Sequence, residues 1–233
     1  LLKLSNAWVV RLCVEETTTI LVAQGAKDFL DDLHRLDAVL LENAIAEAAG
    51  SVSPGGAFIA LDAVREGPGG RLHDWYSDPR LGGVIQHDTR SHMHSDLHRY
   101  LFASCYAKTF GVSPKVTQFP RGLLPAHENA TDDHPPFSDR FRVQLASSPS
   151  STVVAHLAKD GHYFIHPDPS QCRSLTVREA ARLQTFPDNY FFEGNRTQQY
   201  TQVGNAVPPL LARKIALVVL DFMRLSSRQS APR

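Results

Sequence analysis

The sequence predicts a mixed α/β fold, and three features of the chain support that prediction. Short runs rich in β-branched and aromatic residues recur between residues 141 and 166, which is typical of short strands. Apolar residues three and four positions apart predict an amphipathic helix over 26–49. Near the C-terminus, Thr176 and Pro209 each stand where a further helix is expected to begin.

The N-terminal part is predicted to contain one or two strands within 1–25, followed by the helix over 26–49 with Gly50 as its C-cap. A short strand is expected at 57–61, between two glycine-rich breaks. No internal repeat is visible.

The middle of the chain is rich in histidine, proline and aspartate. One helix is predicted within 96–110, where apolar residues recur at helical spacing. The stretch 111–136 contains five prolines and is predicted to be an irregular, exposed connection. Short strands are expected after it, at 141–145, 151–156 and 162–166.

Two helices are predicted to close the chain. The first opens at Thr176 with Glu179 three residues later, which is the capping-box pattern, and Pro187 ends it. The second begins at Pro209, because proline suits a first helical turn. Apolar residues occupy nearly every face of this second helix over 210–223, so it is expected to be buried.

Composition limits the possible functions only loosely. The 24 basic and 24 acidic residues give a formal net charge of zero, which does not exclude DNA binding because a local basic face is sufficient. Three widely separated cysteines without a CxxC pair argue against a disulfide framework and fit a reducing cytoplasm. We expect no signal peptide and no membrane span, which takes ~20 apolar residues. Because Leu1 replaces an initiating Met, we expect the chain to begin inside a longer protein.

Two segments near the C-terminus resemble a known family. Residues 173–188 have the sequence Arg-Ser-Leu-Thr-Val-Arg-Glu-Ala-Ala-Arg-Leu-Gln-Thr-Phe-Pro-Asp, and residues 200–209 have Tyr-Thr-Gln-Val-Gly-Asn-Ala-Val-Pro-Pro. The first resembles the ninth motif of DNA cytosine-5 methyltransferases, and the second resembles the tenth. Their order and separation match that family, and the resemblance covers residues 137–223.

The resemblance implies a division of the chain. Residues 86–175 would form a small, irregular, strand-rich target recognition region. Residues 176–225 would form the helices of the ninth and tenth motifs, which return to an S-adenosylmethionine-dependent methyltransferase fold. Residues 1–85 have no indicated role, and 226–233 is expected to be a frayed tail. If the methyltransferase core is absent, the last helix would need another partner, such as residues 1–85, or would drive self-association.

The resemblance also implies a cofactor site. The turn Asn205-Ala206-Val207 would line a pocket for S-adenosylmethionine that the upstream half of the protein completes. A turn that exposes backbone groups at the start of a helix suits polar ligand contacts. The alternative is that Gly204 and Asn205 only cap a buried helix.

By the same resemblance, Thr152, His156 and Lys159 would face double-stranded DNA. Hydroxyl groups and cations are the usual partners of phosphate, so Thr152 would bond a phosphate. The alternative is an ordinary hairpin with a polar turn at Lys159.

The reaction that the family performs needs groups that this sequence lacks. In the family, the cytosine leaves the base stack, a cysteine thiolate that follows a proline attacks C6, and an acidic residue before Asn-Val protonates N3. C5 then takes the methyl group from S-adenosylmethionine. None of the three cysteines follows a proline, and Cys13 and Cys105 are expected to be buried and inert. Glu42 and Glu128 each precede Asn-Ala, but neither has a partner cysteine, so no catalytic residue is assigned. Arg90 is a candidate only for contact with the flipped base.

No metal site is expected. His162 and His166 are predicted to lie on a strand, where four residues span ~13 Å, too far for ligands of one ion. His94 and His98 would meet on a helix, but no further ligand is evident.

Three hypotheses about function follow. The chain is an inactive C-terminal portion of a DNA cytosine-5 methyltransferase of the restriction–modification kind, or a natural DNA-recognition subunit for a separate catalytic partner, or a degenerate DNA-binding module. The absence of an initiating Met favours the first. An initiating codon just upstream of Leu1 would favour the second, and failure to bind S-adenosylmethionine with the catalytic half present would favour the third. The sequence indicates neither the DNA target nor the oligomeric state.

Overall fold

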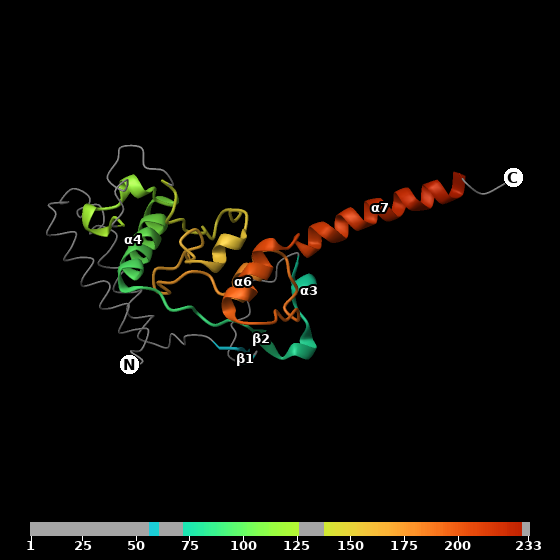
Figure 1. The fold of residues 1–233 in the computed structure, drawn as a ribbon, viewed down its shortest axis with the longest axis horizontal. Coiled ribbons are helices and arrows are strands. Elements are labelled where there is room, and N and C mark those ends of the chain that lie inside the picture. The colour runs from blue at the N-terminus through green and yellow to red at the C-terminus, as the bar shows by residue number, and fades with distance from the viewer. Residues whose placement is uncertain (1–55, 61–71, 126–137, 230–233) are drawn as a thin grey trace. The chain divides into compact units, whose positions relative to one another are not determined.

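Figure 1 shows the fold in a computed structural model, which describes residues 56–60, 72–125 and 138–229. The strands predicted within 1–25 and the helix predicted over 26–49 lie outside the described residues. The described chain divides into two compact units. The first unit contains 88–125, 138–152 and 159–176, and the second contains 57–60, 72–87, 153–158 and 177–229. The domain boundaries proposed from the sequence stay a prediction.

The first unit is built around α4 (His94–Phe110), which confirms the helix predicted within 96–110. Gly111 ends it with a φ of 70°, the left-handed conformation that glycine adopts without a steric penalty. The buried face of α4 carries Tyr100 and Phe102, and both are almost fully excluded from solvent. This face forms the main hydrophobic core of the unit.

The segment after α4 corrects one prediction, because it is not simply an exposed connection. It forms two short 3-10 helices, η3 (Val116–Gln118) and η4 (Arg121–Leu123). Val116, Phe119 and Leu123 are buried against α4, and the rings of Phe119 and Phe102 have centroids 4.8 Å apart. The prolines therefore shape the backbone while the apolar residues between them complete the core.

The strand content of the first unit is lower than predicted. The runs 141–145 and 162–166 meet only in isolated bridges, in which Ile165 pairs with Val143 in parallel and with Ser174 in antiparallel orientation. Ile165 is fully buried at this point. The strand predicted at 151–156 is wrong, because the chain there turns into the 3-10 helix η6 (Ala155–Ala158).

The second unit contains a two-stranded antiparallel sheet of β1 (Phe58–Ala60) and β2 (Gly83–Ile85). The strand predicted at 57–61 is thus confirmed. Between the strands lie α3 (His73–Tyr76) and the 3-10 helix η2 (Pro79–Leu81). Gly83 packs directly on β1, since a Cβ there would overlap the carbonyl oxygen of Ile59 and the ring of Phe58.

The helix predicted to open at Thr176 is α5 (Val177–Leu183). The sequence did not predict the next helix, α6 (Arg196–Asn205). Asn195 begins this helix with a reciprocal capping box, in which its side chain accepts from the backbone N–H of Gln198 at 3.0 Å and the Gln198 carboxamide accepts from Asn195 N–H at 2.8 Å.

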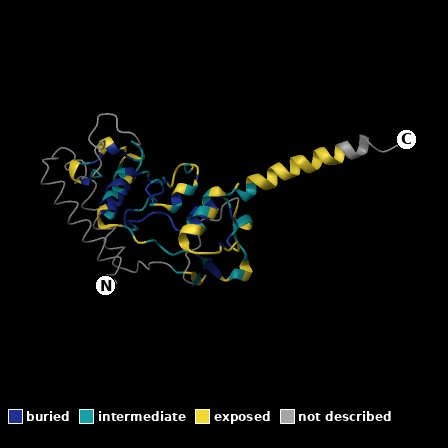
Figure 2. Cartoon of the chain, in the orientation of Figure 1, coloured by how far each residue is buried: buried dark blue, intermediate teal, exposed yellow. Residues whose placement is uncertain are grey.

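The last helix, α7 (Pro209–Gln229), starts where it was predicted. The expectation that it would be buried is wrong: every residue from 211 to 225 is exposed, as the yellow helix in Figure 2 shows. Its apolar residues include Ile215, Val218 and Phe222, whereas Arg213, Lys214, Asp221 and Arg224 place charge on the same helix. Among the residues that the structure describes, no helix has the length and apolar character that crossing a membrane requires.

Candidate functional site

In the first unit, the polar turn at Lys159 to His162 is held in a single conformation. The backbone N–H of His162 donates to the Asp160 carboxylate at 3.0 Å, which closes the turn locally. Gly161 has a φ of +79°, and a Cβ there would lie 2.6 Å from the Cβ of Ser174. Only glycine satisfies both the conformation and the close approach, so the backbone beside Lys159 is fixed by packing.

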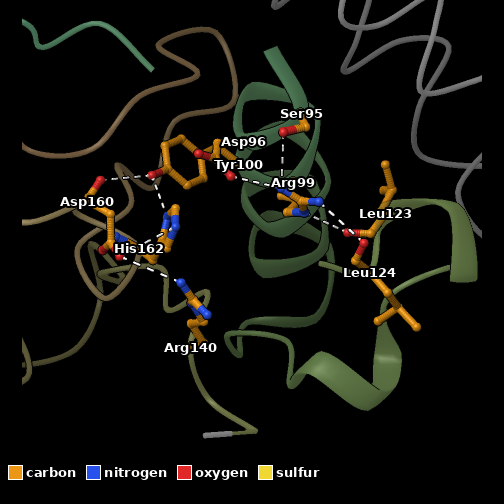
Figure 3. A network of polar contacts seen from close by, with 9 residues as sticks. All are labelled: Ser95, Asp96, Arg99, Tyr100, Leu123, Leu124, Arg140, Asp160 and His162. Atoms are coloured by element: carbon orange, nitrogen blue, oxygen red, sulfur yellow. Dashed lines mark hydrogen bonds and ion pairs between the residues drawn. The ribbon is translucent and has the colours of Figure 1, made fainter. Parts of the chain in front are cut away.

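Figure 3 shows how this turn is tied to α4 through Tyr100. The Tyr100 hydroxyl donates to the Asp160 carbonyl at 3.2 Å and shares a 2.8 Å hydrogen bond with His162 Nδ1. Burial raises the pKa of Tyr100 well above its ordinary value, so the phenol stays neutral. Arg140 adds a weak ion pair, with its Nη2 3.8 Å from Asp160 Oδ2.

The other side of α4 holds η4 through one arginine, also visible in Figure 3. Arg99 donates to the carbonyl oxygens of Leu123 at 2.7 Å and Leu124 at 3.3 Å. Asp96 lies one turn earlier and accepts from Arg99 at 2.8 Å, with both side chains largely buried. The Asp96 carboxylate therefore neutralises the buried Arg99 guanidinium, whose charge strengthens its hydrogen bonds to the two backbone carbonyl oxygens.

Beside the ring of Tyr100 lies a half-buried histidine, His92, with the two ring centroids 4.8 Å apart. Its Nε2 lies 3.2 Å from the backbone nitrogen of Ser174, whose N–H donates to it, so this nitrogen carries no proton. Burial, together with the positive charge of Arg90, lowers the pKa of His92 to about 3. Burial also lowers the pKa of His162. The interior of this unit therefore favours neutral histidines.

The residues predicted to face DNA are all exposed, but they are divided between the units. Thr152 and Lys159 belong to the first unit, and His156 belongs to the second, on η6. Arg90, the candidate for contact with a flipped base, is half-buried in the first unit beside Gly161. Their proposed roles remain predictions.

The second unit is organised by Arg178, whose side chain is almost fully buried on α5. The guanidinium donates to three backbone carbonyls, of Ile85 at 3.0 Å, Pro187 at 3.2 Å and Tyr190 at 2.7 Å. It also stands 5.9 Å from the centroid of the Phe192 ring. Burial lowers the pKa of Arg178 to about 10, which still leaves it charged at neutral pH.

Gln86 completes this arrangement, a structural role that the sequence did not indicate. It is buried with a φ of 56°, its carboxamide donates to the Phe192 carbonyl at 2.7 Å, and it accepts from the Phe192 N–H at 2.9 Å. Its own carbonyl accepts from the backbone of Arg178 at 3.1 Å. This role depends on contacts between segments that lie far apart in the sequence, and such contacts cannot be predicted from a single sequence.

Residues 72–76 also contact the end of α5, in a region for which the sequence indicated no role. The Trp75 indole donates to the Thr185 carbonyl at 2.8 Å, and the Tyr76 hydroxyl donates to the Arg182 carbonyl at 3.0 Å. These carbonyls lie at the C-terminal end of α5, where a helix leaves acceptors without intrahelical partners. Helix α3 thus completes the end of α5.

The predicted cofactor turn joins α6 to α7. Asn205 and Val207 are exposed, and Ala206 between them is half-buried and extended. The buried carboxamide of Gln184 donates to the carbonyl oxygen of Ala206 at 3.4 Å and to that of Val203 at 3.1 Å. The turn therefore has a fixed backbone and an accessible amide side chain at Asn205.

The cysteines within the described residues differ from expectation in one respect. Cys105 is half-buried rather than fully buried, and Cys172 is buried with its thiol donating to the Leu97 carbonyl at 3.2 Å. The rings of His94 and His98 do meet on α4, with centroids 4.6 Å apart. Across the described ranges, no cluster of three or more metal-ligating side chains is found.

Comparison with known proteins identifies the class. The family model of the C-5 cytosine-specific DNA methylases matches residues 86–220, which include α4, η6, α5, α6 and most of α7. The chain belongs to this family of DNA methylases.

The proteins similar to this chain include two bacterial methyltransferases and one mammalian methyltransferase. The chain is 52% identical over 141 residues to the type II methyltransferase M.Bpa9945I of Bacillus paralicheniformis, covering 60% of this chain and 30% of the relative. It is 50% identical over 80 residues to the type II methyltransferase M.AgeI of Thalassovita gelatinovora, covering 34% and 18%. It is 34% identical over 173 residues to DNA (cytosine-5)-methyltransferase 1 of Mus musculus, covering 68% and 10%. The chain thus spans less than a third of each of these relatives. No solved structure matches it.

Proposed function

We propose that this chain supplies the DNA-recognition region and part of the cofactor pocket of a DNA cytosine-5 methyltransferase, which transfers a methyl group from S-adenosylmethionine to cytosine C5. The observation that carries the proposal is the joint packing of the two motif-bearing segments. Gln184 of the ninth motif donates to Val203 and Ala206 of the tenth, so both belong to one folded unit. The family match across 86–220 supports the same assignment.

The DNA side of the proposal concerns the exposed polar residues Thr152, His156 and Lys159. Lys159 stands on a turn whose backbone is fixed by Gly161 and Tyr100, so its ammonium group emerges from a rigid base. Rigid presentation lowers the entropy lost when a phosphate is bound. Arg90 is retained as a candidate for contact with a flipped base, a role that requires extrusion of the base from the duplex.

The cofactor side concerns Asn205, Ala206 and Val207. An exposed carboxamide beside an exposed apolar side chain suits one edge of a pocket for a ligand with polar and apolar parts, and the residues present fit that use. S-adenosylmethionine would supply the methyl group. The role of this turn is to hold the ligand through Asn205, while Gln184 keeps the Ala206 backbone in place.

The nucleophile is proposed to come from outside this chain, because none of its three cysteines follows a proline. The chain alone would then be inactive. The exposed apolar residues of α7, including Ile215, Val218 and Phe222, would pack on the methyltransferase core that carries the nucleophile. A natural recognition subunit that serves a separate catalytic partner remains the alternative.

Binding measurements on the full-length protein test the two sides separately. Asn205→Ala should raise the Kd for S-adenosylmethionine and leave the Kd for duplex DNA unchanged. Lys159→Ala should weaken DNA binding and reduce the slope of log K against log salt by about 0.9, the value for one phosphate contact. Lys108→Ala is the matched control, because Lys108 is an exposed lysine two turns beyond Tyr100 on α4. Equal salt slopes for Lys159→Ala and the wild type would refute the phosphate contact.

A further inference from the structure

We propose that Gln184 and Gly204 couple the DNA-facing segment 153–158 to the cofactor turn 205–207, so that binding at one strengthens binding at the other. The inference rests on the proposed function of those two segments. It adds that their affinities are linked and names the residues that link them. Both residues act by positioning, since neither is proposed to touch a ligand.

The first observation is the contact between backbones at Gly204, near the end of α6. A Cβ at this position would lie 2.5 Å from the backbone nitrogen of Ala155 and 2.5 Å from the carbonyl carbon of Val154. The three nearest atoms all belong to the backbone, which cannot yield as the end of a flexible side chain would. The helix that precedes the cofactor turn therefore rests directly on the start of η6, which carries His156.

The second observation is the hydrogen bonding of Gln184. Its buried Nε2 lies 3.4 Å from the Val153 carbonyl oxygen, 3.1 Å from that of Val203 and 3.4 Å from that of Ala206. One amide group thus donates to the beginning of the DNA-facing segment and to both sides of Gly204. A shift of either segment alone would lengthen at least one of these hydrogen bonds.

The surroundings leave little room for the two segments to move independently. Leu157 on η6 and Val203 on α6 are both fully buried. The backbone N–H of Leu157 donates to the Val154 carbonyl at 3.0 Å, which fixes the turn that presents His156. Because packed interiors transmit small displacements, a ligand that orders one segment also orders the other.

Linkage then fixes the thermodynamic consequence. If DNA tightens cofactor binding by some factor, the cofactor must tighten DNA binding by the same factor. For a direct backbone contact we expect a factor of about ten, within the usual range for coupled sites.

The test uses the full-length protein and measures the Kd of S-adenosylhomocysteine, which cannot donate a methyl group, with and without sheared duplex DNA of mixed sequence. The ratio of the two values is the coupling factor. Gly204→Ala forces the two backbones apart, and Gln184→Met removes the donor while keeping a similar volume. Asp188→Asn is the control, because Asp188 pairs with Arg182 in the same unit and contacts neither segment.

We expect a coupling factor of about ten in the wild type and in Asp188→Asn, and a factor below about three in Gln184→Met and Gly204→Ala. A purely structural role would weaken both affinities and leave the ratio unchanged. The inference is overturned if the wild-type ratio is one, or if Gln184→Met and Gly204→Ala both retain the wild-type ratio. Should either of them misfold, the other decides.

Failure of the underlying function has a different signature. In that case the wild type binds no S-adenosylhomocysteine, or Asn205→Ala and His156→Ala leave the affinities for cofactor and DNA at their wild-type values. That result would overturn the assignment of the two segments and the inference with it. Site variants that act as proposed, together with an unchanged ratio in both Gln184→Met and Gly204→Ala, would overturn the coupling alone.

Discussion

Replacing Arg178 by methionine should strongly destabilise the second unit. The substitution keeps most of the aliphatic stem but leaves three carbonyl oxygens, those of Ile85, Pro187 and Tyr190, without their charged donor. Leaving one buried acceptor unsatisfied costs ~1–3 kcal/mol, so three would cost ~3–9 kcal/mol if nothing relaxed. The carbonyls of Pro187 and Tyr190 lie in a loop and can reach water after a small shift. We therefore expect a loss of about 3–5 kcal/mol in the free energy of unfolding.

The assay is urea unfolding followed by tryptophan fluorescence. Trp75 is one of the two tryptophans in the chain and donates to the C-terminal end of α5, so it reports on this unit when Trp8 is replaced by phenylalanine. Arg196→Met is the matched control, because Arg196 is exposed at the start of α6 and should change stability by less than ~0.5 kcal/mol. A loss below ~1 kcal/mol for Arg178→Met would show that the guanidinium does not organise the unit.

Three further predictions concern local features. The pKa of His92 is lowered to about 3 in the folded protein, against about 6.5 in the unfolded chain. Between these two pH values only the unfolded chain gains a proton at His92, so the free energy of unfolding should fall by ~1.4 kcal/mol for each unit by which the pH is lowered. His92→Phe should remove that part of the slope in acid unfolding curves. Gly161→Ala should cost at least ~2 kcal/mol because of its φ and its contact with Ser174, whereas Gly111→Ala, with a similar φ and open space, should cost ~1 kcal/mol in the same urea assay; equal losses would contradict the packing argument. Asn195→Ala should cost ~1 kcal/mol by removing the cap of α6, seen as faster amide exchange in its first turn, and unchanged exchange would contradict the cap.

The sequence predicted the helices whose ends carry strong local signals. The residues around Thr176 and Pro209 indicate where α5 and α7 begin. The helical spacing of apolar residues predicted α4. It missed α6, whose polar composition gives no apolar stripe, although Asn195 followed by Gln198 is a capping-box pattern. The predicted strand at 151–156 failed because β-branched residues there serve a tight turn packed on Gly204.

The candidate site was predictable only in part. Resemblance to a family pointed to Asn205 and Lys159, and their exposure depends on turns that have local sequence signals. The residues that fix those turns, including Gln184 and Tyr100, act on segments 19 to 62 positions away. Such contacts depend on tertiary packing, which hydrophobic periodicity does not encode. The exposure of α7 was also unpredictable, because an apolar helix is equally compatible with a core or with an interface.

Whether the nucleophile lies outside this chain is tested most directly by transfer of a labelled methyl group from S-adenosylmethionine to cytosine-containing duplex DNA. The measurement compares this chain with the full-length product of its gene. We expect transfer by the full-length protein and none by the chain alone. Transfer by the chain alone would contradict the proposal that the nucleophile lies elsewhere, and Cys172, which immediately precedes residues 173–188, would be the first residue to replace.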